Sequence, residues 1–133
     1  MSAFVDANVV VRHLTGDPPG IAARATAYLA TKPGLLLTDL VVAETVDVVE
    51  SFYEPPRDQI AQAIRSLVGN GSILSVDSAL LRRAIEVYES ERIDVAQAYL
   101  VARAESTGVG KVASFERSID RSTTIERIEP PAV

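Results

Sequence analysis

Apolar and polar residues follow one another along the chain in short blocks, and each block indicates a strand or a helix. Runs of four or five apolar residues that end abruptly at a turn or an acid are typical of buried strands. Longer segments with apolar residues three and four positions apart are typical of helices. The pattern predicts strands at residues 2–5, 35–38, 72–76, 111–115 and 124–128. It predicts helices at residues 21–31, 39–53, 57–68, 78–90 and 94–105, while residues 9–14 fit either an extension of the first strand or a short helix.

Strands and helices alternate throughout this pattern, which is typical of an α/β protein with a mostly parallel sheet and helices on both faces. The chain has 133 residues, which suits one domain with one hydrophobic core. We therefore predict a single domain over residues 1–133, with a three-layer α/β/α fold around a mostly parallel five-stranded sheet. Local signals support the boundaries: Asp17 is expected to cap the helix that follows it, with Pro18 in its first position, and Thr38 is expected to cap the next helix.

The segment 39–53 is the most apolar of the predicted helices, with valines on several sides of the helical wheel. A helix that is apolar nearly all round is expected to be largely buried. Glu44 lies in its middle, and a buried carboxylate costs several kcal/mol unless it is paired, hydrogen-bonded or bound to a metal. The helix pattern alone leaves two further readings open, a buried ion pair and a side chain whose tip reaches water at the edge of a groove.

Acidic residues stand at the ends of several predicted elements. Asp6 follows the first strand, Glu44 lies early in the helix after the second, Asp94 opens the last helix, and Glu116 follows the fourth strand. Ligands of open α/β sheets bind outside the carboxyl ends of the strands, so this topology can bring the four acids together. Such a cluster repels itself unless divalent cations neutralise it. Asp94 also has a simpler reading, because Asp94 and Gln97 have the spacing of a helix capping box.

Composition narrows the chemistry that these acids can perform. The chain has no cysteine and one histidine, His13, which excludes disulfides, thiolate or histidine-rich zinc sites and any mechanism that needs two imidazoles. A metal would be held by oxygen, which favours Mg²⁺ or Mn²⁺. The net charge of −5 argues against a broad electrostatic contact with nucleic acid, although a local basic rim that includes Arg12 is compatible with it. No apolar run is long enough to span a bilayer and no signal peptide is evident, so we expect a cytoplasmic protein.

Five segments in order resemble the motifs of a known family, and together they cover nearly the whole chain. They are Phe4-Val5-Asp6-Ala7-Asn8-Val9, Leu14-Thr15-Gly16-Asp17, Val42-Ala43-Glu44, Asp94-Val95-Ala96-Gln97-Ala98-Tyr99-Leu100 and Ser114-Phe115-Glu116-Arg117-Ser118. The set resembles a PIN domain, and most closely the VapC toxins of VapBC toxin–antitoxin modules. The resemblance implies an endoribonuclease that uses Mg²⁺ or Mn²⁺, acts on an RNA such as tRNA or rRNA, forms a homodimer and is inhibited by a cognate VapB-type antitoxin.

The resemblance also implies the site residues. Asp6, Glu44, Gln97 and Glu116 fall on the family's catalytic positions. The expected metal ligands are Asp6, Glu44 and Glu116, together with Asp94, which lies at the same helix end as Gln97 and can turn toward the cleft. Gln97 and Glu116 depart from the family pattern, which has aspartate at both positions. The alternative reading is therefore a catalytically weakened or inactive PIN domain that serves as an antitoxin-binding or RNA-binding module. A phosphoacceptor signalling domain fits poorly, because one acid rather than a pair follows the first strand.

Overall fold

The structure is a computed structural model that describes residues 2–71 and 73–133. The chain divides into two compact units, residues 1–78 and 79–133, and each is described by itself. The single domain over residues 1–133 stays a prediction. Ser72, the expected first residue of the third strand, lies outside the described residues.

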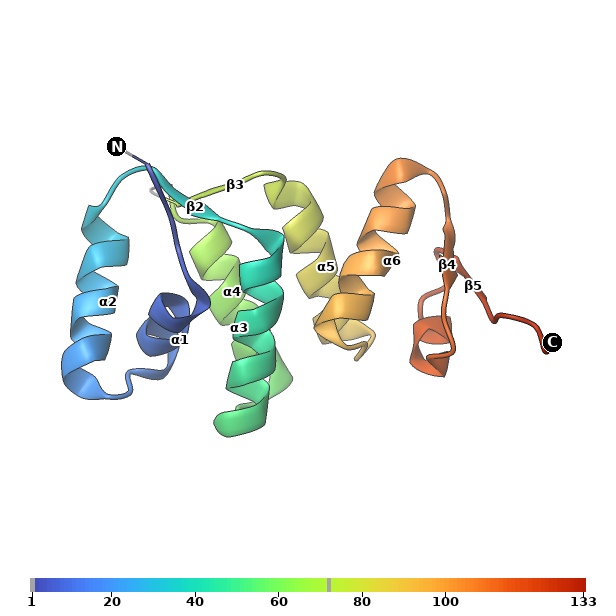
Figure 1. The fold of residues 1–133 in the computed structure, drawn as a ribbon, viewed down its shortest axis with the longest axis horizontal. Coiled ribbons are helices and arrows are strands. Elements are labelled where there is room, and N and C mark those ends of the chain that lie inside the picture. Colours follow the sequence, from blue (N-terminus) through green and yellow to red (C-terminus); the bar gives the residue numbers. More distant parts are fainter. Residues whose placement is uncertain (1, 72) are drawn as a thin grey trace. The chain divides into compact units, whose positions relative to one another are not determined.

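The first unit is a three-stranded parallel sheet whose strands are joined by pairs of helices. Its elements are β1 (Ala3–Phe4), α1 (Ala7–Thr15), α2 (Pro19–Thr31), β2 (Leu35–Leu37), α3 (Asp39–Phe52), α4 (Arg57–Val68) and β3 (Ile73–Ser75). The strand order is β1-β2-β3, with Ala3 opposite Leu35 and Leu35 opposite Ile73. In Figure 1 these strands lie along the upper edge of the unit and its helices extend below them. The central strand β2 is therefore hydrogen-bonded on both sides, and its Leu35 is fully buried.

Residues 9–14, which the pattern left open, lie in the helix α1. Asp6 ends the strand segment and accepts a hydrogen bond from the Ala7 amide at 2.8 Å, which satisfies one of the free N–H groups at the helix start. Gly16 ends the helix with φ 68°, a left-handed conformation that glycine adopts without a steric cost. Local caps at both ends therefore favour the helix where apolar periodicity could not decide.

The start of α2 differs from the prediction. Pro18 is the N-cap, Pro19 is the first helical residue, and no side chain caps the helix start. Asp17 is not a cap; one of its carboxylate oxygens accepts a hydrogen bond from the Tyr53 hydroxyl at 2.9 Å. The Asp17 carboxylate therefore accepts from a hydroxyl that is distant in the sequence, and not from a backbone amide at the start of α2 as predicted.

The helix α3 begins as predicted and is less buried than predicted. Thr38 caps it by accepting from the Val41 amide at 3.2 Å. One face is buried through Val42, Val46 and Val49, but Leu40 is 76% exposed. The helix packs against α1 and α4, so those neighbours cover one side and leave the other in solvent. The expectation of a largely buried helix is therefore wrong for that second side.

The second unit packs two helices with a two-stranded parallel sheet. Its elements are α5, which begins at the unit boundary (Ser78–Ser90), α6 (Val95–Thr107), β4 (Lys111–Ala113), the 3₁₀ helix η1 (Arg117–Arg121) and β5 (Glu126–Ile128). Leu80, Ala84 and Ala102 form a buried cluster to which Tyr99 adds its ring. The helix α6 packs against β4 and η1, and β4 pairs with β5.

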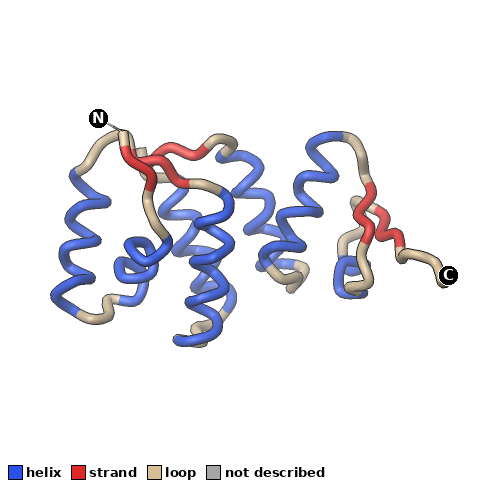
Figure 2. Tube along the Cα trace, viewed as in Figure 1, coloured by secondary structure: helices blue, strands red, loops and turns tan. Residues whose placement is uncertain are grey.

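The predicted α/β class and the parallel direction of the strands are confirmed. In the described residues the five strands form two sheets, of three and two strands, because hydrogen bonds pair them only within each unit (Figure 2). The helix η1 was not predicted, since its five residues bury only Ile119 and carry no helical apolar period. Within the described part of the chain, no helix combines the length and apolar character that crossing a membrane requires.

Candidate functional site

Asp6 occupies the junction between β1 and α1. Its side chain is exposed, and one carboxylate oxygen is engaged by the Ala7 amide at 2.8 Å. A carboxylate that caps a helix through one oxygen still has lone pairs on both oxygens for a second partner. Asp6 therefore stabilises the start of α1 and still has carboxylate lone pairs available to a second partner.

Glu44 is exposed, in contrast to the buried position expected from its helix. It lines a groove of about 290 Å³ between α1 and α3. The groove is formed by Ala7, Asn8, Val11, Arg12, Glu44, Val48, Phe52 and Tyr53. Among residues 2–71 and 73–133, no hydrogen bond or ion pair reaches the Glu44 carboxylate. Of the readings left open by the sequence, the tip at a groove edge is the one that the first unit shows.

The remaining polar groups of this groove come mainly from α1. Asn8 and Arg12 are one helical turn apart and both line it. Arg12 donates one hydrogen bond to the Asp17 carbonyl at 3.2 Å, which leaves other N–H groups of the guanidinium for a ligand. Because Asp6 directly precedes Ala7, the groove begins beside it. Asp6 is therefore the residue that precedes, in sequence, the first member of the groove that contains Glu44.

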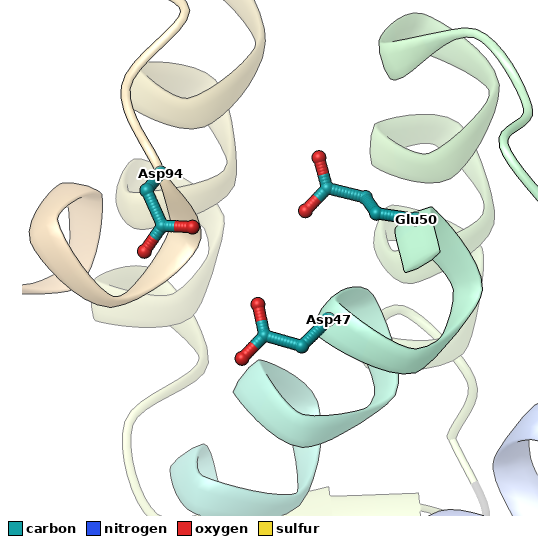
Figure 3. Close-up of side chains that lie close together, drawn as sticks. All are labelled: Asp47, Glu50 and Asp94. Atoms are coloured by element: carbon teal, nitrogen blue, oxygen red, sulfur yellow. The ribbon is translucent and has the colours of Figure 1, made fainter. Parts of the chain in front are cut away.

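Two further carboxylates on α3 were assigned no chemistry from the sequence. Asp47 and Glu50 are three residues apart, and one oxygen of each lies within 4.8 Å of the other (Figure 3). Glu50 also lies 4.0 Å from the Arg57 guanidinium, which supplies a compensating charge within the unit. Their i, i+3 spacing was visible in the sequence, but the pairing with Arg57 needed the turn between α3 and α4. Asp94, also labelled in Figure 3, belongs to the second unit.

In the second unit, Asp94 is the N-cap of α6. Its carboxylate accepts from the Ala96 amide at 3.2 Å. In the capping box expected from the spacing, the Asp94 carboxylate would accept from the Gln97 amide instead, and among the described residues the Gln97 side chain does not accept the reciprocal bond from the Asp94 amide. Gln97 itself is half-buried in the first turn of α6. The capping role of Asp94 is thus confirmed and the partner differs.

Glu116 is exposed and caps η1. One of its carboxylate oxygens accepts from the Ser118 amide at 3.0 Å, while its own amide donates to the Ser114 hydroxyl at 2.9 Å. The Ser118 amide is the main cause that holds the pKa of Glu116 below its ordinary value, with Arg121 and Arg127 contributing more weakly. Glu116 is therefore ionised at neutral pH, and part of its hydrogen-bonding capacity is already used.

The donors in both units are of the kind that a hard divalent cation prefers. Asp6, Glu44, Asp94 and Glu116 all offer exposed carboxylate oxygens. Glu44 fits best, because in the described residues neither a cation nor a hydrogen-bond donor engages its carboxylate, whereas the other three each accept from a backbone amide. The set of site residues predicted from the sequence stays a prediction, since Asp6 and Glu44 belong to one unit and the other members to the second.

Comparison with known proteins gives one family. A family model described as PIN domain matches residues 3–123, which is most of the chain. A comparison with curated proteins gives no match.

Proposed function

The chain belongs to the PIN domain family, and from this premise we propose that it is the toxin of a type II toxin–antitoxin pair that cleaves RNA phosphodiester bonds. Members of this family are generally metal-dependent nucleases. The observation that carries the proposal is the exposed Glu44 carboxylate, which lacks a partner among the described residues and stands in a groove that begins beside Asp6. An exposed carboxylate that no group of the protein engages has its oxygens available to a ligand from outside the protein.

The proposed ligands of Mg²⁺ or Mn²⁺ are Asp6 and Glu44 in the first unit and Asp94 and Glu116 in the second. When bound, such a cation would lower the pKa of a water molecule and offset negative charge on the phosphate. Arg12 lines the same groove as Glu44 and has N–H groups that can hold a phosphate oxygen. Gln97 keeps an oxygen that can orient water, but it adds no charge.

The family also includes proteins that work in pairs with an inhibitor. We extend the proposal to a cognate VapB-type antitoxin, a homodimer and a cytoplasmic location, with tRNA or rRNA as the substrate class. Exposed apolar residues such as Phe52 and Leu40 on α3 support a protein contact on this unit.

A second candidate function rests on Gln97. A neutral, half-buried amide where the family has aspartate weakens cation binding, so the domain would bind RNA or an antitoxin and cleave slowly or not at all. The two candidates differ in one measurable property, which is metal-dependent cleavage.

The deciding experiment compares wild type with Asp6→Asn in cleavage of RNA with Mg²⁺ or Mn²⁺. Asparagine keeps the cap on α1, so the fold is preserved while the charge is lost. We expect cleavage by Asp6→Asn to fall about 100-fold, and we expect the cation to raise the thermal midpoint of wild type but not that of Asp6→Asn. Asp58→Asn, which changes an exposed acid of α4 outside the Glu44 groove, is the matched control and should behave as wild type. Equal cleavage by wild type and Asp6→Asn would exclude this mechanism.

A further inference from the structure

A second groove in the first unit lies between α1 and α2 and has a volume of about 450 Å³. This size falls within the range of small-ligand pockets, roughly 300–1,000 Å³. Its lining consists of Asn8, Val9, Arg12, Ile21, Arg24, Ala25 and Tyr28. Two arginines and no acid line it, although the whole chain has a net charge of −5. The groove is therefore locally basic on an acidic protein.

The α2 side of this groove presents an aromatic ring beside a guanidinium. Arg24 and Tyr28 are four residues apart, so they share one face of the helix. Arg24 is exposed and Tyr28 is 45% exposed. Among the described residues, no hydrogen bond or ion pair occupies Arg24. An unpaired guanidinium next to an open aromatic face suits a ligand that has both an anionic group and a flat ring.

This second groove shares two lining residues with the groove that contains Glu44. Asn8 and Arg12 line both, one on each flank of α1. The helix α1 packs against both α2 and α3 in the first unit (Figure 1). A chain-like ligand can therefore extend from one groove into the other past the same two side chains.

We propose that the groove between α1 and α2 binds one nucleotide of a single-stranded RNA whose neighbouring phosphodiester lies at Glu44. Arg24 holds a phosphate and Tyr28 stacks on the base. This inference rests on the proposed function, and it adds the single-stranded form of the substrate and two binding residues. An acidic peptide would satisfy Arg24 but would leave the aromatic face of Tyr28 without a planar partner, so RNA is the occupant that uses both.

The test measures binding in the absence of metal, where cleavage cannot occur. A fluorescein-labelled single-stranded RNA of eight nucleotides is titrated with the full chain in EDTA, and anisotropy gives Kd at several salt concentrations. Arg24→Ala should weaken binding about fivefold at 0.1 M salt and lower the slope of log K against log salt by about 0.7, the value for one phosphate contact to a single strand. Tyr28→Leu should weaken binding about tenfold and leave the slope unchanged, because stacking releases no counterions.

Matched variants separate these roles from general effects. Arg24→Lys keeps the charge and Tyr28→Phe keeps the ring, so both should retain most of the affinity. Arg82→Ala removes one exposed arginine of α5 outside this groove and should change Kd by less than about twofold. All these positions are exposed or partly exposed, and alanine is well tolerated in helices, so loss of folding is not expected.

Three results would overturn the inference. One is wild-type affinity in both Arg24→Ala and Tyr28→Leu, and another is an equal loss in Arg82→Ala, which would indicate nonspecific attraction. The third is displacement of the RNA by a deca-glutamate peptide whose binding is weakened by Arg24→Ala and unchanged by Tyr28→Leu. That result would assign the groove to an acidic protein partner. Failure of the proposed function looks different: the RNA would bind with the predicted dependence on Arg24 and Tyr28, but metal would not bring about cleavage.

Discussion

Glu44 of α3 and Glu105 of α6 are both helical glutamates, and their surroundings differ sharply. Glu105 accepts two hydrogen bonds from the Arg83 guanidinium, at 2.8 and 2.9 Å, and a third from the Thr124 hydroxyl. Glu44 stands in a groove, and in the described part of the chain neither a cation nor a donor of the protein reaches it. One carboxylate is compensated by its own unit, and the other is left for something outside the protein.

This difference separates acids that hold the fold together from acids that are available for chemistry. The Arg83 side chain links α5 to α6 through Glu105 and also contacts Glu86 on its own helix. Loss of the Glu105 charge should therefore affect stability, whereas loss of the Glu44 charge should affect ligand binding. A Glu44 variant that lowers stability without affecting ligand binding, or a Glu105 variant that lowers ligand binding without affecting stability, would contradict this distinction.

The largest expected effect is on cleavage, in Glu44→Gln. Glutamine keeps the size and exposure of the side chain and removes its charge, so we expect RNA cleavage to fall about 100-fold with little change in the thermal midpoint. Initial rates with Mg²⁺ on a fluorogenic RNA give the measurement. Glu105→Gln is the matched control and should keep most of the activity. A Glu44→Gln protein with wild-type cleavage would remove Glu44 from the proposed ligands.

Much of the fold follows from local sequence signals. The bounds of α4 and α5 agree with the predicted helices, and Thr38 caps α3 as expected. Local signals failed where a distant residue competed for a group, as when the Tyr53 hydroxyl engaged Asp17. Caps and apolar spacing involve residues that are close in the sequence, so a sequence pattern can predict them. A tertiary hydrogen bond joins residues that are distant in the sequence, so no local pattern predicts it.

The candidate site was only partly predictable, for a similar reason. The sequence singled out Glu44 but placed it in a buried helix, because a helical wheel records residue types and not which neighbours cover each side. The contacts of α3 with α1 and α4 leave Glu44 in a groove and Leu40 76% exposed. Arg24 and Tyr28 were not singled out at all, since exposed residues on an alanine-rich helix produce no pattern.

The next effect concerns Gln97, the neutral residue among the proposed site positions. Gln97→Asp adds a carboxylate to the first turn of α6, where the helix dipole also favours negative charge. We expect cleavage with Mg²⁺ to rise about tenfold and the metal to bind more tightly, because a charged oxygen ligand replaces a neutral one. Gln97→Asn is the matched control, since asparagine has the shape of aspartate without its charge. An equal gain in both variants, or no gain in either, would show that charge at this position does not limit the activity.

A smaller effect is expected on stability, from the compensated side of the comparison. Glu105→Gln should lower the free energy of unfolding by about 1 kcal/mol, a value that already allows for solvent around side chains that are 20% and 32% exposed. Urea denaturation of wild type, Glu105→Gln, Arg83→Ala and the double variant gives the coupling energy between the two residues. Additive losses would mean that the Arg83–Glu105 pair contributes nothing beyond its separate side chains. Glu44→Gln, measured in the same way, should differ from wild type by less than about 0.5 kcal/mol.

The smallest effect is a pH dependence of the stability that Glu105 contributes. The hydrogen bond from Arg83 is the main cause that holds the pKa of Glu105 below its ordinary value of 4.5, with the Thr124 hydroxyl adding to it. A carboxyl whose pKa is lower in the folded state binds protons more readily when unfolded, so its contribution to stability is present above pH 4.5 and is lost as the pH falls through the folded pKa. The stability difference between wild type and Glu105→Gln should therefore stay constant from pH 7 to about pH 5.5 and shrink below about pH 4.5. The stability difference between wild type and Arg83→Ala should shrink over the same pH range, because this variant removes the same contact through its other partner. A difference that persisted undiminished to about pH 3 would mean that the stabilisation by Glu105 does not depend on its charge, and the contrast with Glu44 would then be one of packing.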